Sequence, residues 1–176
     1  MLRTAIALII AVIVAAACTT TPPPKPLNDG ELALPGNYSS WPKFLSAVQR
    51  PDSKQVREIY MNEVGAAGTA SSGFADGTVF VMENYAAKTN ADGSLATGPD
   101  GKLVKGNLLR VFVMGKGAGW GQAVPPPLRN GNWVYASYLP GGEKATDDLN
   151  ACRGCHLPAA SKDYVQRYDE HFAQRN

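Results

Sequence analysis

The chain of 176 residues carries 17 Lys and Arg against 15 Asp and Glu, which gives a formal net charge of +2 at pH 7. This length suits one domain with a sizeable core and leaves little room for a second. The balanced charge and the lack of any run of basic residues argue against nucleic acid as a partner.

The first 18 residues have the pattern of a bacterial export signal. Arg3 supplies one positive charge, residues 6–14 form a short apolar run, and three alanines precede Cys18. The run is too short for a transmembrane helix, so we predict a signal peptide over residues 1–18 and a protein of the periplasm. Two cleavage routes remain open: ordinary signal peptidase, or a lipoprotein route in which Cys18 is acylated and anchors the chain to the membrane. Acylation would also remove a lone thiol from an oxidising compartment.

Residues 19–30 contain four prolines and few apolar side chains. Such a stretch is extended and semi-rigid, so it is predicted to be a linker that holds a domain away from a membrane anchor. A disordered N-terminal tail is the alternative. From residue 31 the composition becomes that of a globular chain, and residues 31–176 are predicted to form the single domain.

The apolar pattern of the domain predicts mainly strands. Side chains from Tyr38 to Val48 follow a helical spacing, so a short helix is expected there. Strands are then expected over residues 55–62, 77–86, 108–114 and 132–139, where β-branched and aromatic side chains concentrate. The turn signals that separate the strands are Asp76-Gly77, Asp92-Gly93, Asp100-Gly101 and Asn130-Gly131.

Helical character returns near the C-terminus. A helix around residues 152–156 is expected to begin at Asp147 or Asp148 as its N-cap. A last helix is expected to carry Tyr164, Val165, Tyr168 and Phe172 on one face. Short strands joined by tight turns leave no room for parallel crossovers. The predicted fold is α+β, a predominantly antiparallel β-sheet with a short N-terminal helix and C-terminal helices.

The sequence Cys152-Arg153-Gly154-Cys155-His156 has the spacing of a c-type haem attachment site. On a helical turn, residues three apart share one face, so both thiols can bond the two vinyl groups of one porphyrin. We therefore expect one covalent haem c, held by Cys152 and Cys155, with His156 as the proximal iron ligand. One alternative is a dithiol redox pair, which usually has a strand–helix context. The other is half of a zinc site, for which the sequence offers no second Cys or His pair.

Four segments resemble the cytochrome P460 family and its relative cytochrome c′-β. They are Phe74–Glu83 (FADGTVFVME), Val56–Tyr60 (VREIY), Gly131–Trp133, and the Cys152–His156 motif followed by Asp163-Tyr164-Val165. The resemblance covers roughly residues 31–173 in consistent order. It implies a homodimer with an antiparallel β fold and one covalent haem per chain. It also implies a five-coordinate iron whose second face is open to small nitrogen ligands.

The resemblance leaves two functions open. Cytochrome P460 enzymes oxidise hydroxylamine, with nitric oxide also part of their chemistry, and they carry a lysine cross-linked to the porphyrin. Met82 occupies the place of that lysine here, and a thioether cannot form the same bond. Lys88 has the same strand parity as Met82 and lies six residues further along the chain. It would therefore supply the cross-link only after a shift of the strand register. The cytochrome c′-β branch lacks the cross-link, and it binds nitric oxide or transfers electrons.

We therefore expect a haem protein that binds nitric oxide or a similar small ligand, or that exchanges electrons with a redox partner protein. The alternative is a haem oxidoreductase that acts on hydroxylamine or nitric oxide. The sequence therefore leaves open whether the chain is an enzyme.

Further residues are candidates for the pocket on the open iron face. Phe80 and Met82 share one strand face, so they would form an apolar cap there, with ordinary core packing as the alternative. A third interpretation of Met82 is that it serves as a sixth iron ligand. Arg57 follows the family's pattern at an arginine near the haem, where it would hydrogen-bond a bound ligand or neutralise a propionate; a solvent-facing arginine is the alternative. His171 is expected at the surface or edge of the last helix rather than on the iron.

Overall fold

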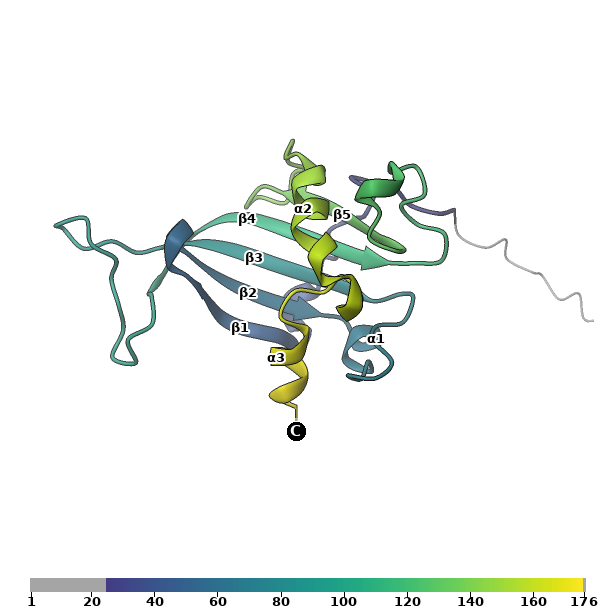
Figure 1. Cartoon of the computed structure of the whole chain (residues 1–176). Coiled ribbons are helices and arrows are strands. Elements are labelled where there is room, and N and C mark those ends of the chain that lie inside the picture. Colours follow the sequence, from purple (N-terminus) through teal and green to yellow (C-terminus); the bar gives the residue numbers. More distant parts are fainter. Residues whose placement is uncertain (1–24, 176) are drawn as a thin grey trace, which may run out of the picture.

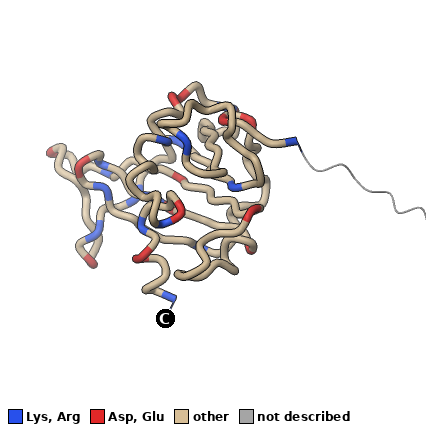
Figure 2. The backbone as a smooth tube through the Cα atoms, turned by 45° about the vertical axis from the view of Figure 1, so that its right-hand side comes forward, with Lys and Arg blue, Asp and Glu red and all other residues tan. Residues whose placement is uncertain are grey.

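The computed structural model describes residues 25–175. The predicted signal peptide, Cys18 and the first part of the predicted linker lie outside the described residues. Within residues 25–175, no helix has the length and apolar character needed to span a membrane. Figure 2 shows that basic and acidic residues are interspersed along the chain rather than separated onto two sides.

A five-stranded antiparallel sheet forms the body of the domain (Figure 1). Its strands are β1 (Lys43–Arg50), β2 (Gln55–Met61), β3 (Val79–Ala87), β4 (Lys105–Lys116) and β5 (Trp133–Tyr138). The strands lie in chain order, so each pairs with its sequence neighbours and every connection is local. The four predicted strands correspond to β2–β5, and the α+β class with a predominantly antiparallel sheet is confirmed. The glycines of the four predicted turns, Gly77, Gly93, Gly101 and Gly131, all have positive φ.

The helix predicted from Tyr38 to Val48 is wrong. Only Tyr38–Ser40 form a single 3-10 turn, and the chain enters β1 at Lys43. The β1–β2 pairing contains two register irregularities, and Ala47 within β1 has a φ of 50°. Such irregularities break the alternation of a strand, so buried residues no longer fall on every second position. Phe44, Leu45 and Val48 are all buried for this reason, and their spacing imitates that of a helix.

The helices are short: α1 spans Glu63–Ala66, α2 spans Leu149–His156 and α3 spans Tyr168–Ala173. Helices α2 and α3 lie across one face of the sheet, and α1 lies at the end of the strands (Figure 1). Helix α2 begins as predicted, with Asp148 as the N-cap whose Oδ1 accepts a hydrogen bond from the Asn150 N–H at 3.0 Å.

The predicted last helix is shorter than expected. Tyr164 and Val165 precede α3, because Asp163, Tyr164 and Arg167 all have the left-handed backbone conformation that ends a helix. The intervening 3-10 segment, Leu157–Lys162, connects α2 to this region. These breaks bend the chain after the Cys152–His156 motif instead of continuing its helix.

Two hydrophobic clusters lie on opposite faces of the sheet. The cluster under the helices is aromatic and includes Phe44, Phe74, Phe80, Trp133 and Phe172. The cluster on the other face consists mainly of valines from β3–β5, together with Leu32 and neighbouring residues of the N-terminal segment. The chain ahead of β1 therefore packs against the sheet. This contact begins before residue 31, at residues that the sequence assigned to the linker, because Asp29 and Gly30 hydrogen-bond to β5.

Candidate functional site

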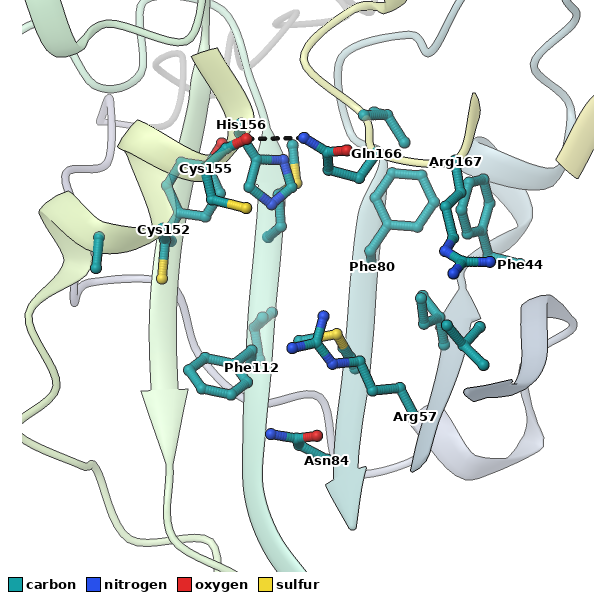
Figure 3. Close-up of a pocket in the computed structure, with 18 of the residues that line it drawn as sticks. Phe44, Arg57, Phe80, Asn84, Phe112, Cys152, Cys155, His156, Gln166 and Arg167 are labelled. Carbon is teal, nitrogen blue, oxygen red and sulfur yellow. Dashed lines mark hydrogen bonds between the residues drawn. The ribbon is translucent and has the colours of Figure 1, made fainter. Parts of the chain in front are cut away.

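The Cys152–His156 motif lies at the edge of a cavity of about 620 Å³ between the helices and the sheet (Figure 3). Helix α2 contributes Cys152, Cys155 and His156 to the lining, and β1–β5 contribute the opposite wall. In Figure 3 the motif lies along one side of the cavity, and Phe112, Arg57 and Asn84 project from the strands on the other. A volume of this size falls within the range of ligand and cofactor sites.

The imidazole of His156 is held in one orientation by the backbone. Its Nδ1 lies 2.6 Å from the carbonyl oxygen of Tyr164. A carbonyl oxygen only accepts, so Nδ1 carries the proton and donates it, and Nε2 is left without one. Burial lowers the pKa of His156, which favours the neutral ring. A neutral, oriented imidazole with a free Nε2 is the state in which histidine binds a metal.

Cys152 does not have the environment of a nucleophilic thiol. Burial raises the pKa of the Cys152 thiol to about 11, and Asp29 and Asp147 add to that effect. A nucleophilic cysteine of a redox pair has a lowered pKa instead. Among residues 25–175, no third Cys, His, Asp or Glu joins the pair in a metal-binding group. Cys155 is exposed, and its carbonyl oxygen accepts a hydrogen bond from Gln166 Nε2 at 2.7 Å.

The strand register arranges the sheet wall in cross-strand rows. Phe80, Met114 and Tyr135 form one row, and the Tyr135 ring lies 5.3 Å from the His156 ring. The next row along contains Ile59, Met82 and Phe112, and the one after it contains Arg57, Asn84 and Arg110. The wall thus changes from aromatic beside His156 to polar at its far end.

The predicted pocket residues Arg57, Phe80 and Met82 all line this cavity. Phe80 is buried and packs edge-on against Phe44 and Phe74, so it belongs to the core as well as to the cavity. Met82 is partly exposed to the cavity. Lys88 is exposed one residue beyond the end of β3 and is not among the lining residues.

The position of His171 differs from the expectation. Its side chain is 3% exposed, stacks on Phe44 with ring centroids 4.3 Å apart, and bonds through Nδ1 to the Phe44 carbonyl oxygen at 2.8 Å. It is therefore a core residue, because the bend before α3 turns this face of the helix onto β1. It is not among the residues that line the cavity.

The cavity-wall residues that sequence reasoning missed include Asn84, Phe112 and Tyr135. Asn84 shares strand parity with Phe80 and Met82, so alternation alone would have found it. Phe112 and Tyr135 join the site through the register between strands, which a single sequence does not reveal. Asn84 is only 7% exposed, and neither its Oδ1 nor the Tyr135 hydroxyl has a hydrogen-bond partner among the described residues.

Positive charge gathers on the β1–β2 side of the cavity. Arg50, Arg57 and Arg167 all belong to the lining, whereas the cysteines lie on α2, which packs near β5 at the other edge of the sheet. Burial lowers the pKa of Arg57, and the charges of Arg50 and Arg167 lower it further. Among the residues that the structure describes, Arg50 and Arg57 form no ion pair, and Arg57 Nε is buried without a partner. This side of the cavity is therefore suited to an anionic group.

One comparison with known proteins gives a match. A family model described as cytochrome P460 matches residues 35–167, which include all five strands and the Cys152–His156 motif. A search of curated proteins found no match.

Proposed function

Since this chain belongs to the cytochrome P460 family and is by that membership a c-type haem cytochrome, we propose that its iron has an open axial position that binds nitric oxide or a similar small ligand. Transfer of electrons to a partner protein is compatible with the same site. When bound, the haem supplies an iron centre with one-electron redox chemistry. The chain's own residues hold the group, orient its proximal ligand and shape the space on its other side.

The cavity residues fit a single covalent haem. Cys152 and Cys155 would form the two thioether bonds, and His156 offers a free Nε2 held in place by the Tyr164 carbonyl. The propionates of a porphyrin lie opposite its vinyl groups. Arg50, which forms no ion pair among the described residues, lies on the side of the cavity away from the cysteines, where it would neutralise such carboxylates. Arg57 lies on the same side and would either assist there or hydrogen-bond a bound ligand. The anionic edge and the thioether edge of the group thus have matching partners.

The proposal of ligand binding rests mainly on Met82. This residue lies in the cavity wall at the place where P460 enzymes carry their cross-linking lysine, and within residues 25–175 no lysine lines the cavity. Lys88 is exposed beyond the end of β3. Without an amine beside the porphyrin, the protein tunes its iron through the pocket alone. This supports the c′-β type of function over hydroxylamine oxidation.

Oxidation of hydroxylamine or nitric oxide is the second candidate, and one observation favours it. Arg57 Nε and Asn84 Oδ1 are a buried donor and a buried acceptor, and neither has a partner among the described residues. Such a pair suits a ligand that both accepts and donates hydrogen bonds, as hydroxylamine does. A diatomic ligand would use only the donor.

The setting that we propose follows from the sequence. The export signal predicted over residues 1–18 supports a periplasmic protein, and Cys18 is the residue that would carry a lipid anchor. A homodimer and a redox partner protein are proposed on the resemblance to the family.

The optical spectrum of the dithionite-reduced protein tests the proposal, with the Cys152→Ala/Cys155→Ala variant as the control that lacks covalent haem. We expect an ordinary high-spin ferrous c-type spectrum that changes on addition of nitric oxide. A strongly red-shifted Soret band would mean that a lysine cross-link exists, and it would favour hydroxylamine oxidation. Hydroxylamine-dependent reduction of an electron-acceptor dye, measured on the same sample, separates the two candidates directly.

A further inference from the structure

Arg153, one of the two variable residues inside the Cys152–His156 motif, points away from the cavity into the protein. Its side chain is 0% exposed. Its guanidinium meets the carboxylate of Asp29 through two bonds, Nε to Oδ2 at 2.6 Å and Nη2 to Oδ1 at 2.8 Å. Nη2 also donates to the carbonyl oxygen of Trp133 at 3.2 Å. This bidentate geometry is the strongest form of an arginine–carboxylate contact.

Asp29 comes from the segment ahead of the sheet, 124 residues away in sequence. Its Oδ1 also accepts a hydrogen bond from the Tyr135 N–H at 2.9 Å, and the next residue, Gly30, donates its N–H to the Tyr135 carbonyl at 2.8 Å.

Further hydrogen bonds hold the N-terminal segment on either side of Asp29. The Leu27 carbonyl accepts from the Gly121 N–H, and the Leu32 carbonyl accepts from the Tyr138 hydroxyl. Asp29 is thus fixed to β5 as well as to α2.

The ring of Tyr135 connects this ion pair to the proximal side of the cavity. The Arg153 guanidinium carbon lies 5.3 Å from the Tyr135 ring centroid, within cation–π range. The same ring lies 5.3 Å from the His156 ring. A continuous set of contacts therefore runs from Asp29 through Arg153 and Tyr135 to His156.

Helix α2 needs such support. It has only eight residues, and a helix of two turns is marginal without tertiary contacts. A guanidinium with no exposed surface is costly to bury unless its charge is matched, and removal of one partner leaves the other charge uncompensated. The Asp29 carboxylate, whose side chain is 18% exposed, matches this charge, so the pair is close to neutral.

We propose that Asp29 and Arg153 are positioning residues for the haem: their ion pair fixes the attachment helix against β5 and cancels a buried positive charge close to His156. This inference rests on the proposed haem function. It gives the N-terminal segment, which looks like a linker in the sequence, a part in setting the reduction potential of the iron.

The test compares Asp29→Asn, Arg153→Met and the double variant, all as mature haem proteins, by covalent haem content and by reduction potential. Reduction adds one electron from dithionite to the ferric iron, so the site loses one positive charge. Asp29→Asn leaves the guanidinium unmatched, which favours reduction and raises the potential. Arg153→Met leaves the carboxylate unmatched, which lowers the potential. The double variant should return near the wild-type value.

Asp169→Asn is the matched control. It removes the same charge from an ion pair with Lys162 whose carboxylate side chain is 75% exposed, so solvent screens the change and the potential should stay near the wild-type value. Arg153→Lys keeps the positive charge but loses the bidentate contact. Its reduction potential should therefore stay closer to the wild-type value than its covalent haem content does.

Shifts of the same sign in the two single variants, or no shift beyond that of Asp169→Asn, would overturn the inference. If the single variants do not accumulate, the double variant should still accumulate, because it contains no unmatched charge. If the double variant does not accumulate either, the inference is overturned. Absence of covalent haem in the wild-type protein would instead refute the proposed function, so the two failures are distinguishable.

Discussion

Nδ1 of His156 lies 2.6 Å from the backbone carbonyl oxygen of Tyr164, eight residues further along the chain. Tyr164 has a φ of 59°, in the left-handed region, and this conformation belongs to the bend that ends the helical segment after the motif. The bend thus brings a carbonyl oxygen back to the imidazole and fixes the ring. Hydrogen bonding at Nδ1 also makes Nε2 a better electron donor to a metal.

The first prediction concerns this imidazole. His156→Ala should keep the haem attached through Cys152 and Cys155 but lose the proximal ligand, because the thioether bonds do not depend on the iron. The measurement is the optical spectrum together with haem retention after denaturation. An iron spectrum unchanged from the wild type would show that His156 is not the ligand.

Met82→Leu should leave the spectrum of the reduced protein unchanged. Met82 is a wall residue in our proposal, and leucine has a similar volume and apolar character, so the five-coordinate iron should be unaffected. Met114→Leu is the matched control, since Met114 also lines the cavity from the neighbouring strand. Conversion of a six-coordinate, low-spin spectrum to a high-spin one in Met82→Leu alone would identify Met82 as an iron ligand.

Arg57→Gln should weaken the binding of azide to the ferric protein by about tenfold, which corresponds to the loss of one charge-assisted hydrogen bond. Arg57 projects into the cavity and its Nε has no partner among the described residues, so an anionic ligand would be stabilised by it. Arg57→Lys keeps the positive charge but lacks the planar guanidinium group, so it should give an intermediate affinity for azide. Equal azide affinities in all three proteins would assign Arg57 to the porphyrin carboxylates instead.

His171 should make the protein less stable in mild acid. Burial lowers its pKa below the ordinary value of about 6.5, and the nearby charge of Arg175 lowers it further. The unfolded chain therefore binds a proton first as the pH falls through that value, and the free energy of unfolding decreases.

Urea denaturation at several pH values measures this effect. His171→Asn keeps a donor for the Phe44 carbonyl oxygen but does not titrate, so its stability should fall less between neutral pH and mild acid. If wild type and variant lose stability in parallel over this range, His171 is not the group responsible.

Phe74→Ala should reduce the free energy of unfolding by about 3–5 kcal/mol. The Phe74 ring is buried and contacts five other aromatic rings, so truncation leaves a cavity that they cannot fill. Val64→Ala, at an exposed position on α1, should change stability by less than about 0.5 kcal/mol. A loss in Phe74→Ala no larger than that of the control would contradict the packing described for this cluster.

Local patterns explain which elements were predicted correctly. The strands β2–β5, the Asp148 N-cap and the glycine turns depend on neighbouring residues, and each was visible in the sequence. Strand β1 was missed because its register irregularities, one of them near Ala47, displace apolar residues from alternate positions. The length of α3 was overestimated because the left-handed residues before it leave no signal in the apolar spacing.

The sequence by itself determined the motif on which the proposed haem attachment rests, because the spacing of Cys152, Cys155 and His156 within one short helix is a local property of the chain. Only the tertiary structure decided what surrounds that chemistry. Asn84, Phe112 and Tyr135 reach the cavity through the register of separate strands, and Asp29 reaches Arg153 across 124 residues. Such contacts depend on how distant segments pack when the sheet and helices form. The apolar periodicity within one segment does not predict them.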